Sequence, residues 1–304
     1  MIKSITVTNH VGESLKIELT RPEKSGFIVL PSEGLVEPAK ATINTTKVAT
    51  LDGTMYNSAY LGQRDIVLNL QFMETGTETI EDIRLKSYKY FPERRQIKLV
   101  IETDKHLVET HGYVEHNKPD VFTQTEGTSV TIICNDPYLY AVEPTILNFS
   151  TVVSAFEFPF SNESLTKPLI EFATISKETR AIIYYDGDSE VGMTLVLHAT
   201  GNVKNLTIHN LTANKKMRID TTKLSTLTGK EIVAGDTITI ETRNRQKSIT
   251  LLREGKTFNI INCLDRGTAW LTLSKGDNDI YYQADEGDMN IQFKIEYRNA
   301  YEGV

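Results

Sequence analysis

The sequence has few cysteines, a single tryptophan and no long apolar run. Its two cysteines, Cys134 and Cys263, lie far apart and match no metal-ligand spacing such as CxxC. We interpret them as buried, reduced thiols, with a disulfide as the alternative, and such cysteine use is typical of a protein made in a reducing cytoplasm. No segment approaches the roughly 18 apolar residues that span a bilayer. The first residues alternate instead of forming charged and apolar regions, so we expect no signal peptide.

The chain also lacks an excess of positive charge. It carries 33 Lys and Arg residues against 40 Asp and Glu residues, a formal net charge of -7. A protein that coats nucleic acid needs clustered cations to neutralise phosphates, so the composition excludes that role. A channel through which DNA only passes is compatible with this charge, because mildly acidic walls repel phosphate.

Recognisable catalytic motifs are missing. No GxSxG, HExxH, GxxxxGK[ST] or GxGxxG pattern occurs, and no pair of carboxylates stands out as acid and base. Histidines recur every five residues at His106, His111 and His116, but this odd spacing puts neighbours on opposite faces of a strand. The acidic segments 186–190 and 285–288 are predicted as turns. We therefore expect no catalytic centre, no cofactor and no metal site.

Alternation of apolar and polar residues dominates what is present, and it predicts a mainly β protein. The clearest strand in the first half is Arg64–Phe72, with its apolar residues on one face. A turn is predicted at Asn117–Asp120, and residues 21–40 are predicted to be mostly loop. The other strands predicted in this half are Ile5–Val7 and Leu15–Leu19 as a hairpin, Phe27–Leu30, Gln96–Glu102, Leu107–Glu115 and Ser129–Cys134.

One helix is predicted near residues 79–91. Thr79 and Asp82 resemble a capping box, and apolar residues recur at helical spacing from Ile80 onwards. Acidic residues lie in the first turn and lysines near the end, which suits the helix dipole. Pro92 follows the last helical residue. We expect an amphipathic helix docked on a sheet, with a partner-binding helix as the alternative.

The second half is predicted to be all β, a sandwich or jelly roll of short strands between Gly, Asp and Asn residues. Turns are predicted at Asp186-Gly187 and Gly276–Asn278, and the last strand is expected at a sheet edge. The predicted strands are Ala181–Tyr185, Met193–His198, Leu206–Asn210, Lys215–Ile219, Thr237–Thr242, Ser248–Arg253, Trp270–Leu273 and Met289–Tyr297. Asp136-Pro137 breaks the pattern of the first half, so we predict two domains, 1–140 and 141–304.

Several stretches, in order along nearly the whole chain, resemble the distal tail proteins of siphophages that infect Gram-positive bacteria. Each is weak alone, and their ordered combination carries the resemblance. They are the Asp52-Gly53 turn with Gly62–Ile66, Tyr88–Pro92, Gly112–Glu115, Cys134–Tyr138, Gly235–Ile238, Lys247–Ile249, Leu273–Asn278 and Tyr297–Val304.

The resemblance implies a structural virion protein at the tip of a long-tailed phage or a tail-like particle, assembled in the host bacterial cytoplasm. Its N-terminal domain would build a homohexameric ring around a channel for DNA in transit, and its C-terminal domain would be a galectin-like sandwich. The implied partners are further copies of the chain, the tail tube protein, the tail-associated hub or lysin protein, the tape measure protein and a receptor-binding protein or tail fibre. No membrane insertion is implied.

Exposed sheet edges are templates for pairing with another chain, and a closed ring of identical contacts uses them. We therefore expect Arg64–Phe72 and the Gln96–Glu115 hairpin to supply ring-forming surfaces.

Two other functions are weighed against this one. The first is a carbohydrate-binding module that recognises a host cell-wall glycan, with Trp270, Tyr281 and Tyr282 as its stacking platform. The second is a β-rich glycosidase, for which the sequence nominates no pair of carboxylates.

Overall fold

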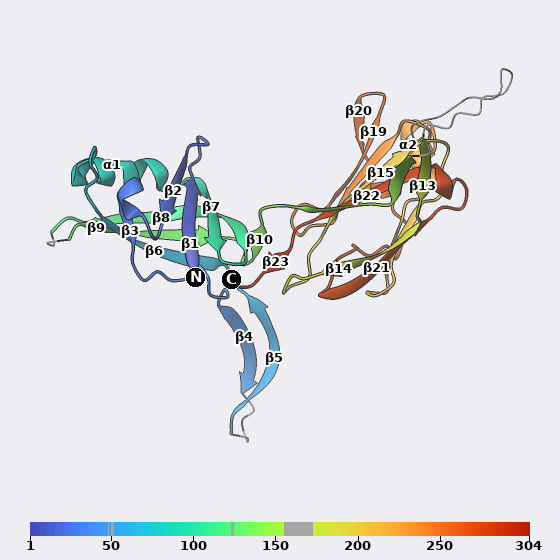
Figure 1. Cartoon of the computed structure of the whole chain (residues 1–304). Coiled ribbons are helices and arrows are strands. Elements are labelled where there is room, and N and C mark those ends of the chain that lie inside the picture. Colours follow the sequence, from blue (N-terminus) through green and yellow to red (C-terminus); the bar gives the residue numbers. More distant parts are fainter. Residues whose placement is uncertain (48, 50–51, 123–124, 155–172) are drawn as a thin grey trace, which may run out of the picture. The chain divides into compact units, whose positions relative to one another are not determined.

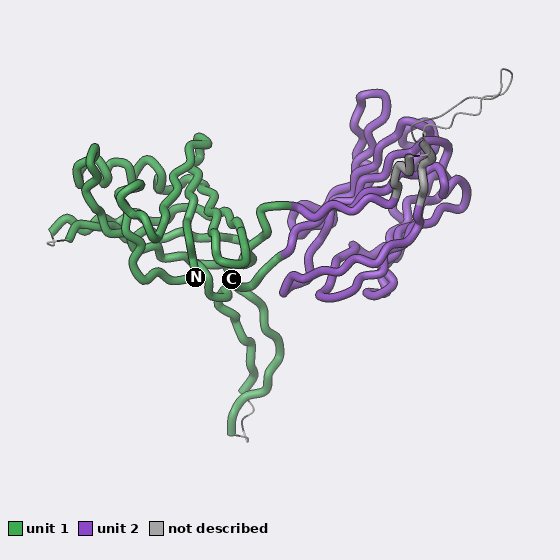
Figure 2. The backbone as a smooth tube through the Cα atoms, in the orientation of Figure 1, with its two compact units in different colours: residues 1–143, 300–304 green, residues 144–299 purple. Residues whose placement is uncertain are grey.

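The chain folds into two compact units. A computed structural model describes it from Met1 to Val304 apart from residues 48, 50–51, 123–124 and 155–172 (Figure 1). Unit 1 contains Met1–Glu143 and Ala300–Val304, and unit 2 contains Pro144–Asn299 (Figure 2). The predicted division leaves the last residues in the second domain, whereas here they return to unit 1. The reason is a short antiparallel pairing of β23 (Ala300–Tyr301) with β10 (Leu139–Ala141).

The prediction of a mainly β chain with a helix in its first half is confirmed. Besides β10 and β23, unit 1 contains β1 (Ile2–Thr8), β2 (Ser14–Glu18), the 3-10 helix η1 (Pro22–Lys24), β3 (Phe27–Val29), β4 (Ala41–Lys47), β5 (Thr54–Leu61), β6 (Arg64–Phe72), α1 (Ile80–Tyr90), β7 (Gln96–Thr103), β8 (Leu107–Asp120) and β9 (Gly127–Cys134).

One large antiparallel sheet forms the body of unit 1. Its strand order is β2-β1-β7-β8-β9-β6-β3, and β10 joins it through β8. Strand β8 is long enough to pair with β7 through its first half and with β9 through its second half. The apolar faces of the long strands line one core.

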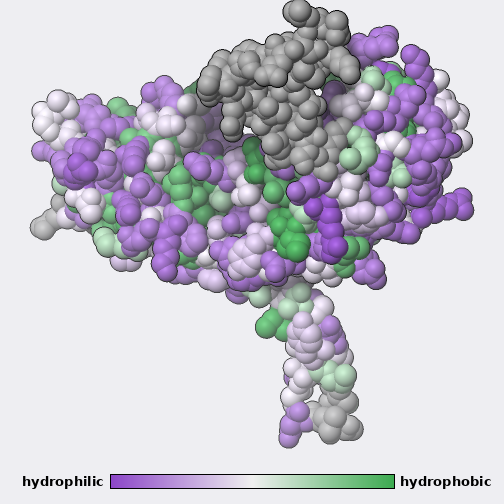
Figure 3. All heavy atoms as spheres, turned by 45° about the vertical axis from the view of Figure 1, so that its right-hand side comes forward, coloured by the Kyte–Doolittle hydropathy of each residue, from purple (hydrophilic) through white to green (hydrophobic). Residues whose placement is uncertain are grey.

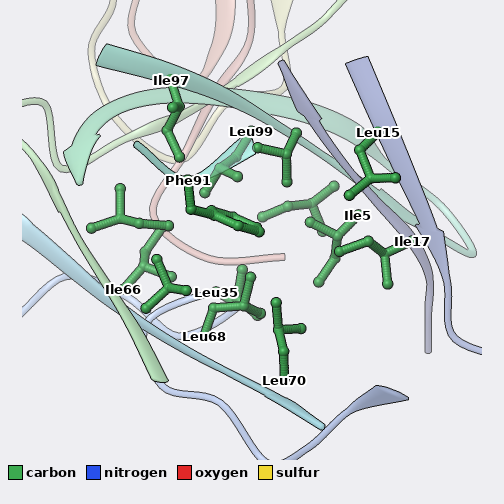
Figure 4. Close-up of a cluster of buried hydrophobic side chains, with 14 of the residues drawn as sticks. Ile5, Leu15, Ile17, Leu35, Ile66, Leu68, Leu70, Phe91, Ile97 and Leu99 are labelled. Atoms are coloured by element: carbon green, nitrogen blue, oxygen red, sulfur yellow. The ribbon is translucent and has the colours of Figure 1, made fainter. Parts of the chain in front are cut away.

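The core of unit 1 follows from the alternation in the sequence. In β6 the residues Arg64, Ile66, Leu68, Leu70 and Phe72 are buried and those between them are not. Figure 4 shows Ile66, Leu68 and Leu70 meeting apolar residues of β1, β2 and β7 and Phe91 from the end of α1. Each fully buried Leu or Ile contributes about 1.5–3 kcal/mol to the free energy of folding, so this face determines the register of the sheet.

Helix α1 has the capping box predicted from the sequence. The Thr79 hydroxyl accepts a hydrogen bond from the Asp82 backbone N–H, and the Asp82 carboxylate accepts one from the Thr79 N–H at 2.9 Å. The Thr79 N–H and the Thr79 hydroxyl both donate to this carboxylate, and they hold the pKa of Asp82 below its usual value. Ile83 is buried on the side of the helix that packs on the sheet, and Phe91 is buried at its C-terminal end. The expected amphipathic, docked helix is therefore present.

Thr79→Ala is expected to lower the free energy of unfolding by about 1 kcal/mol, because the Asp82 N–H loses its acceptor and the Asp82 carboxylate loses the hydroxyl that donates to it. Urea denaturation followed by far-UV circular dichroism measures the change. Thr77→Ala is the matched control, since Thr77 is exposed and outside the helix. Equal stability of the two variants would contradict the assigned role of Thr79.

The turn predicted at Asn117–Asp120 is wrong, because β8 continues through it. The Asn117 amide donates to the carbonyl oxygens of Ser87 and Phe91 at 3.2 and 3.3 Å, and its oxygen accepts from Thr128 at 2.6 Å. Asn117 therefore satisfies carbonyl groups at the end of α1 from within a strand. A residue typical of turns serves here as a helix cap supplied by another element.

Unit 2 contains a sandwich of two antiparallel sheets. One sheet has the order β11-β22-β15-β18-β19-β20, and the other has the order β14-β21-β16-β17. A separate pair is formed by β12 and β13. The elements are β11 (Thr145–Asn148), β12 (Ser150–Ser154), β13 (Ala173–Lys177), β14 (Arg180–Tyr185), β15 (Thr194–Ala199), β16 (Thr207–Asn210), β17 (Lys215–Arg218), α2 (Thr221–Thr228), β18 (Thr237–Glu241), β19 (Ser248–Arg253), β20 (Lys256–Asn259), η2 (Ile261–Cys263), β21 (Gly276–Gln283), η3 (Asp288–Asn290) and β22 (Ile291–Tyr297).

The short helix α2 was not predicted. Its signals are an N-cap and a C-cap: the Asp220 carboxylate accepts from the N–H groups of Thr222 and Lys223, and Gly229 adopts φ 80° after the last turn. The helix itself is rich in threonine, which has a low helix propensity. The sequence of α2 therefore has capping residues at both ends but no helical pattern of apolar residues between them, so it did not indicate a helix.

Two predictions near the end of unit 2 are wrong. Trp270–Leu273 is not a strand, since only Leu273 forms an isolated bridge, to Val191. Gly276–Asn278 is not a turn but the start of β21. The buried Asn278 side chain forms hydrogen bonds with the backbone of Ser274 and Gly276. These bonds hold the loop that leads into β21.

Two further predictions concern strand order. Strand β22 lies between β11 and β15, so the last long strand is central and not at an edge. Asp186-Gly187 is not a hairpin turn, because β14 pairs with β21 while the following strand, β15, belongs to the other sheet. Alternation reports which residues are buried, but it does not report which strands are neighbours.

Candidate assembly surface

The strands expected to offer free edges have none. Strand β6 pairs with β3 and β9, β7 pairs with β1 and β8, and β8 pairs with β7 and β9. Arg64–Phe72 and the Gln96–Glu115 hairpin therefore offer no free edge to another copy, and that they supply ring-forming surfaces stays a prediction. Their backbone hydrogen bonds are used inside unit 1.

A different part of unit 1 is exposed. Residues 41–61, which we call the arm, hold β4 and β5, and these strands pair only with each other in the described part of the chain. All of β4 and nearly all of β5 are exposed, and the arm projects from the body of unit 1 (Figure 1). An isolated two-stranded hairpin is marginally stable in water, so the arm has the properties of an element completed by a partner.

A bulge gives the arm two different faces. Ala41, Ile43 and Thr45 alternate along β4, and their partners across the hairpin are Leu61, Ala59 and Tyr56. The register shifts between Asn44 and Thr45, which brings Tyr56 onto the face that holds Ile43. This face is therefore largely apolar, although Ile43 and Tyr56 are 62% and 66% exposed.

The opposite face of the arm is more polar, although it also carries Tyr60 and Met55 across from Thr42 and Thr46. The Asn44 amide donates to the Ser58 hydroxyl at 3.0 Å, and the Asn57 amide donates to the Thr46 hydroxyl at 2.6 Å. The only charged residues of the arm are Lys47 and Asp52, both near its tip. Figure 3 accordingly shows pale and green surface along much of the arm. A nearly neutral surface of this kind favours contact with protein over contact with phosphate.

Arg64 fixes the base of the arm. Its buried guanidinium donates to the carbonyl oxygens of Gly34, Glu37, Pro137 and Glu302 at 2.8, 2.6, 2.9 and 2.6 Å. Burial lowers the pKa of Arg64, and the backbone oxygens supply its hydrogen bonds. One side chain thereby joins the segments before the arm, after the arm and at the end of unit 1.

The three aromatic residues predicted as a sugar-stacking platform do not lie on one surface. Tyr282 is buried, with its ring against Phe149 and Phe293, and burial raises its pKa. Tyr281, its neighbour in β21, points to the opposite face. Trp270 is half-buried, and the Lys247 ammonium lies 5.5 Å from the centre of its ring.

His106 and the two cysteines considered in the sequence have packing contacts or are buried. The His106 ring packs against Tyr301 at 4.7 Å. Over the described residues, no group of three His, Cys, Asp or Glu side chains is arranged to hold a metal ion. Cys134 and Cys263 are buried free thiols whose pKa values burial raises, so the disulfide alternative is wrong. No helix in the described ranges is long and apolar enough to cross a membrane.

These features define a β-rich protein with an exposed two-stranded arm on one unit and a two-sheet sandwich as the other. Residues 186–301 match the family model described as the C-terminal domain of the siphovirus-type tail component. This match covers most of unit 2, and the resemblance drawn from the sequence is confirmed by it.

Solved structures agree with this fold. The chain is similar to the Dit protein (gp 19.1) of phage SPP1, described as a paradigm of the hub adsorption apparatus in phages that infect Gram-positive bacteria. The TM-score is 0.64 at 11% identity, over 97% of this chain and 98% of that one. A chain of the phage P2 baseplate, in its activated conformation with Ca, gives a TM-score of 0.52 at 12% identity over the whole of both chains. A search of curated protein sequences found no significant match.

Proposed function

We propose that this chain is a distal tail protein, a structural component of a phage tail tip or of a tail-like particle. In this role, copies of the chain close into a hexameric ring around a channel through which DNA passes. The proposal assigns the chain no enzymatic activity. The observation that carries it is the arm, an exposed hairpin with an apolar face, on a chain whose fold is that of tail hub proteins.

The ring contact follows from the shape of the arm. A hairpin that projects from one copy and docks on a different surface of the next copy makes a heterologous contact, and repeated heterologous contacts close into a ring when the rotation fits. Docking removes Ile43 and Tyr56 from water, at about 25 cal/mol per Å² of apolar surface. The buried Arg64 holds the base of the arm so that its direction is the same in every copy.

The proposed partners follow from a place at the tail tip. A ring there lies between the last ring of the tail tube protein and the tail-associated hub protein, with the tape measure protein in the same channel. Unit 2 is then available to hold a receptor-binding protein or a tail fibre. The particle is assembled in the host bacterial cytoplasm, and the protein is then part of the virion.

Ile43→Asp combined with Tyr56→Asp is expected to abolish ring formation, because two charges would be buried in the contact. Negative-stain imaging and light scattering after size exclusion measure this, and circular dichroism checks that the fold persists. The matched control carries the same change at Leu227 and Leu252, which are exposed in unit 2. Rings that form normally in the arm variant would contradict the proposed contact.

A further inference from the structure

Residues 300–304 belong to unit 1 although they follow unit 2 in the sequence (Figure 2), and we call them the latch. Their backbone pairs with β10, where Tyr301 lies opposite Leu139. Ala300 is buried, and Tyr301 and Val304 pack against the core of unit 1. The latch is therefore an integral part of unit 1 that is supplied from the far end of the sequence.

The latch contacts the chain on both sides of the arm. The Val304 N–H donates to the Val36 carbonyl oxygen at 3.0 Å, and Val36 lies in the segment that leads into β4. The Glu302 carbonyl oxygen accepts from the Arg64 guanidinium at 2.6 Å, and Arg64 follows closely after β5. One short segment thus holds the chain where it enters the arm and where it leaves the arm.

Gly303 allows this close approach because it has no side chain. A Cβ at Gly303 would lie 2.6 Å from the Val36 carbonyl oxygen and 3.3 Å from Pro38. The nearer atom belongs to the backbone, so it cannot turn aside as the end of a flexible side chain can. Any larger residue at position 303 therefore pushes the latch and the segment before the arm apart.

The arm depends on its base for its direction. Among the described residues, β4 and β5 pair only with each other, and the Gly62 N–H donates to the Lys40 carbonyl oxygen where the two strands leave the body. A two-stranded hairpin has no core of its own. Its direction is therefore set by the segments 34–40 and 62–64, which Arg64 and the latch hold together.

The order of the sequence delays this support during synthesis. Domains fold from the N-terminus as units while the ribosome adds about 5–20 residues per second. The arm is therefore made before unit 2, Pro144–Asn299, and the latch follows it only after a delay on the order of 10 s. Nascent chains on one messenger RNA lie close together, so their arms are at a high effective concentration during this delay.

We propose that the latch controls when a chain can enter a ring. The arm takes its ring-forming direction only after residues 300–304 have docked against Val36 and Arg64. Before docking, the base of the arm is loose and the arm does not reach its place on the next copy. A chain therefore joins a ring only once its unit 2 has been made. This inference rests on the proposed ring, whereas the direction of the arm is measured without it.

Distances between spin labels test the direction of the arm in single subunits. The labels are placed at Thr54→Cys in the arm and Glu115→Cys in β8, both exposed positions, and the native cysteines are buried. The changes Ile43→Asp and Tyr56→Asp keep the subunits apart. The expected result is a narrow distribution of distances with the latch docked and a broad distribution when Gly303→Val is added.

Gly76→Val is the matched control, because a Cβ at Gly76 meets nothing within 4 Å, and it is expected to keep the narrow distribution. A second label pair, Glu81→Cys in α1 with Glu115→Cys in β8, reports on the body of unit 1 and is expected to stay narrow in both variants. An unchanged arm distance in Gly303→Val would overturn the proposal. Broadening of the body pair would overturn it too, because the latch would then support all of unit 1 and not the arm.

Ring formation is compared in chains without the two aspartate changes. Gly303→Val is expected to lose the rings seen by negative-stain imaging, and Gly76→Val is expected to keep them. Normal rings from Gly303→Val would overturn control by the latch. Absence of rings from the unmodified chain as well would contradict the proposed function, and the arm distances alone then decide whether the latch directs the arm.

Discussion

Arg64→Met is expected to lower the free energy of unfolding of unit 1 by about 3–5 kcal/mol. The residue is 1% exposed, and its guanidinium donates to four backbone carbonyl oxygens. Methionine fills much of the volume but donates nothing. A buried acceptor without a donor costs about 1–3 kcal/mol, and several lose their donor together.

Arg64→Lys is expected to recover only part of this loss. A lysine ammonium has three donors around one atom, whereas the planar guanidinium reaches carbonyl groups in different directions. Two different nitrogens of the guanidinium, NH1 and NH2, reach the carbonyls of Gly34 and Glu302, and lysine has a single nitrogen in their place.

The two units allow the effect to be assigned. Trp270, the only tryptophan, belongs to unit 2, so its fluorescence follows unit 2 while far-UV circular dichroism follows both units. In urea, Arg64→Met is expected to unfold by circular dichroism before the fluorescence changes. The control is Arg95→Met at an exposed position. Equal stability of these two variants would contradict the role given to Arg64.

Asp236→Ala is expected to lower the free energy of unfolding of unit 2 by about 3–5 kcal/mol. The side chains of Asp236 and Arg253 are 1% and 8% exposed and form a two-point pair, with Nε to Oδ1 at 2.8 Å and NH2 to Oδ2 at 2.5 Å. Asp236 also accepts from the Val233 N–H at 2.9 Å. In the intact protein, the hydrogen bond with Asp236 raises the pKa of Arg253. Alanine at position 236 leaves the arginine charge buried without its counter-ion.

An exposed pair of the same geometry provides the comparison. Arg180 and Asp279 also form a two-point contact, but the arginine side chain is 62% exposed. Asp279→Ala is expected to cost less than about 1 kcal/mol, because solvent screens the pair. The midpoint of urea unfolding followed by Trp270 fluorescence measures both. A loss from Asp236→Ala no larger than that from Asp279→Ala would show that burial is not what makes the first pair important.

The sequence allowed accurate prediction of β6 and α1, each of which has one buried apolar face. Strand β6 begins and ends at the predicted residues, and α1 has the predicted cap at Thr79. The arm was missed because β4 and β5 have no buried face, and alternation of exposed and buried residues is the signal by which strands are recognised. The same exposure that hides the arm from sequence reasoning makes it a candidate contact surface.

Contacts between distant residues were beyond prediction for a different reason. The stacking of His209 on Tyr281 depends on the pairing of β16 with β21, which lie far apart in the sequence and are separated by α2 and several strands. The Arg64 side chain reaches Glu302 across unit 1 for a similar reason. Periodicity assigns a face to each residue, whereas neighbours across a sheet follow from strand order.

Native mass spectrometry of the unmodified chain, combined with electron microscopy of the same sample, tests the proposed ring most directly. We expect a species of six times the 34.3 kDa subunit mass and images of a closed ring with a central opening. A single subunit at every concentration measured, with no ring in the images, would contradict self-assembly through the arm.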